Sequence, residues 1–371
     1  YELKVFSQNG EDGIIEEILR RIGVTIGYFV EFGSGNGLQN NTAYLLTKGW
    51  SGLWIESERL LHPVINQIGV DTQNEVVKEE KRLRVDNSPY GQLLKQIVEG
   101  LFVKHPYRWT TIGSMDHLDA ATLDEFLAFK DKFYVPNNGV LVVAGNFEVE
   151  DTKSKIEAYF GPIPRGNDIE RVDVQEDPID GELKRTFHDP NIQIPMGLVS
   201  YRTPSMKARD AFVLDMISSV LSGGKSYRLY KKMVDDKKVS LQVQAVNLSL
   251  EDYGAYVILS LPVGENTLET LYANIDEEID LLKNELISER EFEKLQNIFE
   301  NNFVNSNASM AGIAKSLARN YMLYENTNLI NSNLDIYKSI SREEIKAVAN
   351  KYLNKNSRVL IDYMPVESEK K

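Results

Sequence analysis

Apolar residues recur at the spacing of an amphipathic helix between Thr122 and Phe133. Phe126 and Phe129 lie three positions apart and Phe133 lies four positions further on, so the three rings would share one face of a helix. Glu125 stands three positions after Thr122, which is the spacing of a capping box at a helix N-terminus. We therefore predict a helix that begins directly after Thr122.

The pattern changes after this helix to a short apolar run at 140–144, which is rich in β-branched residues and predicts a buried strand. The helix and the run are repeated 219 positions later, because Ser341 corresponds to Thr122 and Val359 corresponds to Val140. A repeat of this size predicts two copies of one α+β domain. Further apolar patterns predict strands at 192–201, 239–249 and 254–262, and helices at 211–221, 268–283, 289–301 and 313–323.

The same offset predicts the domain boundaries. The second copy starts near Phe187, so we expect the second domain to span 187–371, after an acidic connector at 167–186. Subtracting the offset places the start of the first copy before Tyr1. We therefore expect a truncated first domain over 57–166, without its opening strands.

The first 56 residues follow a different pattern. An apolar helical face is followed by a strand, a glycine-rich turn, a second helix and a strand that ends in Glu56. Gly33, Gly35 and Gly37 would let the backbone approach a ligand, and Glu56 lies about where a carboxylate would accept ribose hydroxyls. These features predict the opening of a Rossmann-type βαβ unit.

Composition narrows the classes of protein and partner. The 371 residues are 42% apolar and 26% charged, which is typical of a soluble globular chain with more than one domain. No apolar run approaches the ~18 residues that a membrane-spanning helix needs. The net charge of −13 argues against nucleic acid as a partner. The absence of cysteine excludes disulfides and thiolate metal sites but is compatible with any compartment, so no location is predicted.

Four short motifs, in order, resemble the M16 peptidases, the insulinase and pitrilysin family of zinc metalloendopeptidases, over roughly 54–365. The motifs are Glu-Val-Val-Lys-Glu-Glu at 75–80, His-Pro-Tyr at 105–107, Tyr-Val-Pro-Asn-Asn at 134–138 and Tyr-Phe-Gly-Pro-Ile-Pro at 159–164. The resemblance implies an α+β fold with two repeated domains, each an antiparallel sheet covered by helices. It also implies a lineage of zinc peptidases that act on unstructured peptides.

That family holds zinc with an inverted His-x-x-Glu-His motif on a helix and with a later glutamate. By resemblance the later glutamate is Glu80, as a vestigial third ligand; the alternative is a partly exposed side chain that pairs with Arg84 at i+4. No two histidines lie four or five positions apart, so the His-x-x-Glu-His motif is absent. The four are His62, His105, His117 and His188. We therefore expect a chain that does not bind zinc and is inactive alone.

The family also grips substrate backbone with an Arg and a Tyr, seven positions apart, in the second domain. Val234 and Leu241 stand at these positions here. In two-chain family members a partner subunit supplies the pair, so the resemblance implies peptide substrates and a second M16-type subunit as partners. The alternative function is a non-catalytic M16 subunit that binds peptides or a partner.

The first 56 residues resemble instead the N-terminal part of FkbM-type S-adenosylmethionine-dependent methyltransferases, in three stretches at 7–13, 30–37 and 48–56. A methyltransferase sheet needs several more parallel strands, which do not follow Glu56. S-adenosylmethionine binding at Gly33, Gly35, Gly37 and Glu56 would therefore be vestigial, and a methyltransferase-related binding segment is a further alternative. The two resemblances meet at about 54–59 and predict a chimera; the alternative is a divergent natural N-terminus.

Overall fold

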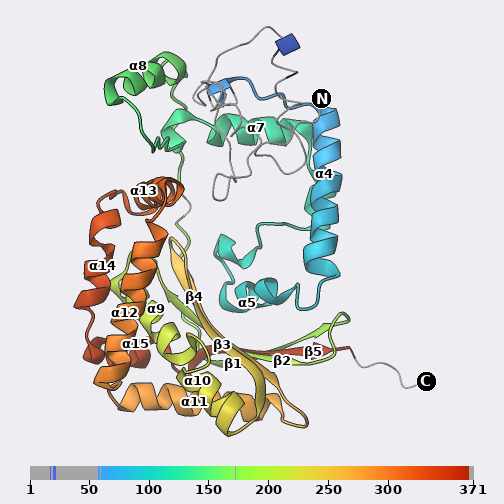
Figure 1. Cartoon of the computed structure of the whole chain (residues 1–371). Helices are drawn as coiled ribbons and strands as arrows, with labels where there is room; N and C mark the ends of the chain where they lie inside the picture. The colour runs from blue at the N-terminus through green and yellow to red at the C-terminus, as the bar shows by residue number, and fades with distance from the viewer. Residues whose placement is uncertain (1–16, 18–19, 22–56, 59, 172, 367–371) are drawn as a thin grey trace. The chain divides into compact units, whose positions relative to one another are not determined.

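The computed structural model describes residues 17, 20–21, 57–58, 60–171 and 173–366 (Figure 1). The chain divides into two compact units, and each is discontinuous in sequence. The first combines Tyr1–Thr72, Ala121–Arg171 and Asn305–Ile330; the second combines Gln73–Ala120, Val172–Val304 and Asn331–Lys371. Gly33, Gly35, Gly37 and Glu56, with the βαβ segment expected around them, lie outside the described residues. The expected linear boundaries at 56, 166 and 186 stay a prediction.

The second unit contains a five-stranded mixed sheet in the order β1-β5-β2-β4-β3. The strands are β1 (Gly181–Asp189), β2 (Met196–Pro204), β3 (Ser240–Ser249), β4 (Tyr253–Pro262) and β5 (Ser357–Pro365). β1 and β5 are parallel, and the other neighbouring pairs are antiparallel. The last strand in sequence therefore lies between β1 and β2, and the sheet depends on contacts between distant parts of the chain.

Both faces of this sheet are covered, because consecutive strand residues point to opposite sides. On β5, Leu360 belongs to a core with the helices α9 (Arg209–Ser222), α11 (Leu268–Asn284) and α15 (Arg342–Tyr352). Its neighbours Val359 and Ile361 belong to a second core, which includes the buried residues of α5 (Leu93–Leu101). Figure 1 shows α5 and α11 on opposite sides of the sheet.

The remaining described helices are α4 (Gln67–Lys81), α6 (Met115–Ala120), α7 (Leu123–Phe133), α8 (Val149–Phe160), α10 (Arg228–Tyr230), α12 (Glu289–Ser306), α13 (Met310–Tyr324) and α14 (Leu329–Ser339). Of these, α10 and α12 contribute Leu229 and Leu295 to the core that contains Leu360. Short turns of 3₁₀ or π geometry are η1 (Arg82–Asp86), η2 (Pro106–Arg108), η3 (Pro136–Asn138) and η4 (Lys231–Asp236). The described segments confirm the helices and strands expected between 192 and 323 to within a few residues.

The capped helix of the internal repeat is confirmed in both places. Thr122 accepts the backbone N–H of Glu125 at 3.3 Å, and the Glu125 carboxylate accepts the N–H of Thr122 at 2.8 Å. Ser341 and Glu344 make the same two bonds, at 3.1 and 3.0 Å, and α7 and α15 are each 11 residues long.

The strand of the first copy was predicted wrongly. Val359 lies in β5, but the corresponding run at 140–144 forms no strand, and the side chain of Leu141 is 42% exposed. A strand forms by pairing, and β5 has β1 and β2 on its two sides, whereas the described residues offer 140–144 no such neighbour. The described part of the chain therefore contains one β-sheet, which is covered by helices, and the prediction of two repeated sheets is not supported.

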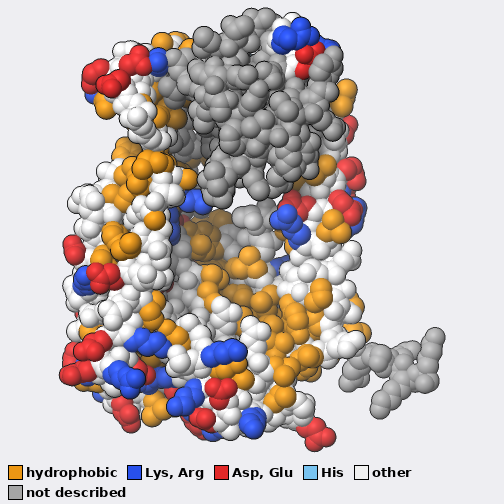
Figure 2. All heavy atoms as spheres, in the orientation of Figure 1, with side chains coloured by type: hydrophobic (Ala, Val, Ile, Leu, Met, Phe, Trp, Pro, Cys, Tyr) orange, Lys and Arg blue, Asp and Glu red, His pale blue; other side chains and the backbone are white. Residues whose placement is uncertain are grey.

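Charged side chains cover the outer helices of the second unit. On the face shown in Figure 2, acidic and basic groups lie intermixed over the helices that cover the sheet. Lys232, for example, pairs with Glu277 and Glu278 at 2.9 Å. The described side chains on this face therefore form no extended basic surface.

Candidate functional site

Glu80 lies near the C-terminal end of α4, in the part of that helix that belongs to the second unit. Its carboxylate lies 3.1 Å from the Arg84 guanidinium, one helical turn later, and its side chain is 41% exposed. The neighbouring cations are also paired, Lys81 with Asp86 at 2.6 Å and Lys78 with Glu75 at 2.7 Å. This is the arrangement that the alternative interpretation of Glu80 describes, an ion pair on a partly exposed helix face.

The four histidines all lie in the described part of the chain, and each is on a different segment. His62 contacts Glu58 at 2.8 Å in the first unit, and His188 is exposed on β1. His105 is buried, and His117 is exposed on α6. Among the described residues, no three His, Cys, Asp or Glu side chains are grouped so that they could hold a metal. Because catalytic zinc in proteins usually needs three protein ligands, the described residues do not fit zinc.

The C-terminal end of α5 is fastened to the sheet by two arginines. Arg185 on β1 donates to the Glu99 carbonyl at 2.6 Å, and Arg202 on β2 donates to the Leu101 carbonyl at 2.9 Å. The last carbonyls of a helix lack partners within the helix and carry partial negative charge, so cations stabilise them. Gly100 permits the close approach, since a Cβ there would lie 3.2 Å from Val359.

The turn after α5 binds a carboxylate from a distant segment. Glu176 accepts three backbone N–H groups, from Val103 at 2.9 Å and from Lys104 and His105 at 2.6 Å each. Burial alone would raise the pKa of Glu176, but these donors and the nearby Arg202 outweigh it and lower that pKa. The carboxylate therefore stays ionised and fixes the turn.

Aromatic rings make the same turn rigid. His105 packs edge-on against Tyr107 and Tyr253, with ring centres 4.2 and 5.4 Å apart, and Phe102 packs edge-on against Tyr107 at 5.7 Å. The Nδ1 atom of His105 accepts the N–H of Tyr107 at 3.2 Å, and its Nε2 atom lies 3.4 Å from the Asp252 carboxylate. His105 is buried among these contacts and thus has a structural role.

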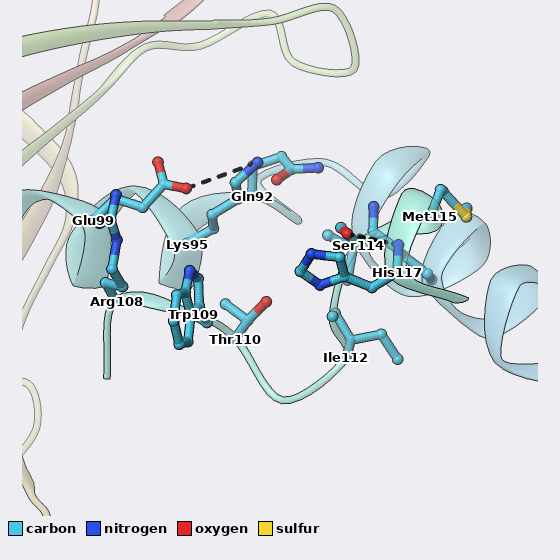
Figure 3. A pocket seen from close by; sticks show the side chains of 13 residues that line it. Gln92, Lys95, Glu99, Arg108, Trp109, Thr110, Ile112, Ser114, Met115 and His117 are labelled. Atoms are coloured by element: carbon cyan, nitrogen blue, oxygen red, sulfur yellow. Dashed lines mark hydrogen bonds and ion pairs between the residues drawn. The ribbon is translucent and has the colours of Figure 1, made fainter. Parts of the chain in front are cut away.

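A pocket of about 540 Å³ lies between this turn, the outer side of α5 and α6, within the second unit (Figure 3). Three of its lining side chains are cations and one is a carboxylate, and the rest are polar or apolar. The lining residues are Lys81, Val85, Gln92, Lys95, Glu99, Arg108, Trp109, Thr110, Ile112, Gly113, Ser114, Met115 and His117. In Figure 3 the His117 ring points toward the Thr110 side chain.

Sequence reasoning missed this pocket. Apart from His117, which was assigned no role, none of its residues was a candidate in the sequence. Two signals were present: Trp109 follows the His-Pro-Tyr motif closely, and Lys81 adjoins Glu80. Glu80 itself does not line the pocket.

Comparisons with known proteins agree with this fold. Residues 120–299 match the family model described as the peptidase M16 inactive domain. The zinc protease PqqE of Helicobacter pylori is 25% identical over 79% of this chain and 66% of its own length. Over most of its length, this chain is similar to zinc proteases of the M16 peptidase family. An uncharacterized zinc protease of Mycobacterium leprae is 23% identical to this chain, over 77% of the chain and 64% of its own length.

Solved structures show the same fold. A protease from Helicobacter pylori superimposes with a TM-score of 0.78 at 24% identity, over 84% of this chain and 76% of that chain. A peptidase M16 inactive domain from Pseudomonas fluorescens gives a TM-score of 0.73 at 18% identity, over 86% of this chain and 76% of that chain. The chain spans about two thirds of the length of these curated relatives.

These findings support the M16 resemblance over most of the chain, and the solved structures confirm an α+β fold. They do not support the methyltransferase resemblance of the first 56 residues or the chimera, which stay predictions. Within the described residues, no helix has both the length and the apolar character that a membrane crossing requires. The role of Glu80 as a vestigial ligand also stays a prediction.

Proposed function

We propose that this chain descends from zinc peptidases but is inactive alone, and that it acts by binding peptides or a partner subunit. One observation carries the proposal: Glu80 pairs with Arg84, and the described residues contain no group of three His, Cys, Asp or Glu side chains that could hold a metal. A lone carboxylate that is already neutralised by a guanidinium provides neither the ligand number nor the geometry of a zinc site. Without such a site the family's way of activating water is lost.

Zinc content and peptide cleavage test this proposal together. We expect the purified chain to contain less than stoichiometric zinc by elemental analysis and to leave an internally quenched fluorogenic peptide intact. The variants Glu80→Gln and Glu79→Gln should behave alike, since Glu79 is an exposed neighbour that pairs with Arg82 at 3.1 Å. Stoichiometric, tightly held zinc with turnover that a chelator abolishes would overturn the proposal. The contradiction would be strongest if Glu80→Gln lost the zinc and the turnover while Glu79→Gln kept both.

A second M16-type subunit is the partner that the proposal favours. Val234 packs against the core of the second unit and Leu241 is exposed on β3, so neither offers the hydrogen bonds of an Arg or a Tyr. A partner subunit that carries this Arg and Tyr pair would supply the missing contacts to the substrate backbone. Sedimentation velocity of the chain, alone and mixed with a subunit of a two-chain M16 peptidase, tests it: a heterodimer supports the proposal, and two unchanged species argue against it.

The domain division and the origin of the first 56 residues are proposals as well. We infer a methyltransferase-like fragment at 1–56, a truncated M16 domain at 57–166, a connector at 167–186 and a second M16 domain at 187–371. Sequencing of source DNA across the codons for 54–59 tests the junction. Calorimetry with S-adenosylmethionine tests the fragment, and we expect no binding, because half a Rossmann unit lacks the other wall of the pocket.

A further inference from the structure

The pocket beside α5 has the size of a ligand site. Its volume of about 540 Å³ lies within the ~300–1,000 Å³ typical of pockets for small molecules and peptide ends. All its lining residues belong to the second unit, and Arg108, at the end of the turn that Glu176 binds, is one of them. A turn that is already fixed lowers the entropy that a bound ligand costs, because it does not have to be ordered on binding.

Positive charge gathers at this pocket although the chain carries a net charge of −13. Lys81, Lys95 and Arg108 line it against one carboxylate, Glu99. Asp86 neutralises Lys81 at 2.6 Å, but Lys95 reaches Glu99 only at 4.0 Å. Arg108 donates from Nη1 to the Val103 carbonyl at 2.9 Å, and a guanidinium has five N–H donors. Lys95 and Arg108 are therefore the cations suited to receive an anionic group.

An apolar surface adjoins these cations. Trp109 lines the pocket with 66% of its side chain exposed, an unusual exposure for the largest apolar residue. Val85, Ile112 and Met115 line the same pocket, and Figure 3 shows Trp109 on the same side as Lys95 and Arg108. Tryptophan at such positions is the side chain that most often anchors a bound partner. The combination fits a ligand with a negative group beside an apolar one.

We propose that this pocket binds the C-terminal end of a peptide, with its carboxylate at Lys95 and Arg108 and its last apolar side chain against Trp109. The inference rests on the proposed function, that this chain binds peptides without cleaving them. The Thr110 side chain lies between Trp109 and the His117 ring, and the Thr110 hydroxyl and the His117 imidazole supply hydrogen bonds to the peptide backbone (Figure 3).

Two matched peptides test the carboxylate. The probes are N-acetyl-Ala-Ala-Phe with a free carboxylate and the same peptide as its C-terminal amide, and binding to the full chain is measured by calorimetry. We expect the acid to bind about tenfold more tightly than the amide, the effect of one charge-assisted contact of about 1.4 kcal/mol. Equal affinities of the acid and the amide would overturn the inference. No detectable binding of the acid at a peptide concentration of about 1 mM would also overturn it.

Matched variants locate the contact. Lys95→Ala should weaken binding of the acid about three- to tenfold and leave the amide unchanged, and Lys95→Arg should restore it. Lys104→Ala is the control, because Lys104 is 51% exposed against 50% for Lys95 and pairs with Asp177 outside the pocket. Equal losses in Lys95→Ala and Lys104→Ala would mean that the peptide binds elsewhere.

Trp109→Ala tests the apolar contact and should weaken the binding of both peptides about tenfold. A variant that removes an exposed ring elsewhere is the control. Tyr134→Ala removes an exposed ring in the first unit and should change neither affinity. Mass spectrometry of the probes after titration separates the two proposals. Cleaved peptide would overturn the proposed function and not the pocket, whereas intact peptide without binding would overturn only the pocket.

Discussion

Removal of one buried leucine should show that α5 is part of the second unit's core. Leu101 is completely buried beneath the sheet, whereas Leu94 on the same helix is 49% exposed. Leu101→Ala and Leu94→Ala change helix propensity equally, so the difference between the variants reports burial alone. We expect Leu101→Ala to destabilise the contact between α5 and the sheet, and Leu94→Ala to have little effect.

The structure sets the size of this difference. Leu101 lies in one core cluster with Leu198, Val257 and Val359, so its truncation removes apolar contacts and leaves a cavity. Buried Leu→Ala changes cost about 2–5 kcal/mol, and the rigid attachment of α5 by Arg185 and Arg202 limits how far the helix can collapse into the space. We therefore expect about 2–4 kcal/mol for Leu101→Ala and under about 1 kcal/mol for Leu94→Ala.

Hydrogen exchange measured by mass spectrometry reads this difference locally, which suits a chain with two compact units. Peptides that cover β4 and β5 should exchange about 30- to 700-fold faster in Leu101→Ala, since each 1.4 kcal/mol is about tenfold. The same peptides should exchange at nearly the parental rate in Leu94→Ala. Equal protection of β5 in both variants would refute the assignment of α5 to this core.

Three further changes concern buried or paired charges and a helix cap. Arg358→Met should lower the free energy of unfolding by about 3 kcal/mol in urea titrations, because it removes the bidentate partner of the buried Asp276, at 2.5 and 3.1 Å, and leaves only the exposed Lys355 at 3.0 Å. Ser341→Ala should cost about 0.5–2 kcal/mol in the same assay by removing the cap of α15. The hydrogen bond from Arg228 lowers the pKa of Glu291 from 4.5 to about 2, so its stabilisation is complete above pH 4.5 and is lost as the pH falls toward 2. Urea titrations across this range should show a smaller acid loss in Glu291→Gln.

Local patterns predicted the helices well, because caps and periodicity depend on neighbouring residues. Thr122 and Glu125 mark the start of α7, and Ser341 and Glu344 mark the start of α15. The apolar run at 140–144 failed for the opposite reason, since a strand exists only where distant segments pair with it. The same dependence hid the place of β5 between β1 and β2, which no local pattern encodes.

The candidate site was less predictable than the fold. The sequence alone shows that the histidine pair of the zinc motif is absent. The i+4 spacing of Glu80 and Arg84 also predicted their contact, as the alternative role of Glu80. The pocket could not be found in this way, because Lys95 on α5 meets Trp109 only after the chain has turned through 102–108. The turn is fixed in its shape by Glu176, more than 70 positions away in sequence.

The contact of Glu176 has a practical consequence for the production of fragments. A fragment that starts at Phe187, where the repeat places the second domain, would lack both this carboxylate and α5. One sheet face would then present bare apolar residues to water, among them Leu198, Val257 and Ile361. Large exposed apolar patches promote aggregation, so such a fragment should be recovered as aggregates. A soluble fragment of this unit has to retain Gln73–Ala120 and the segment around Glu176.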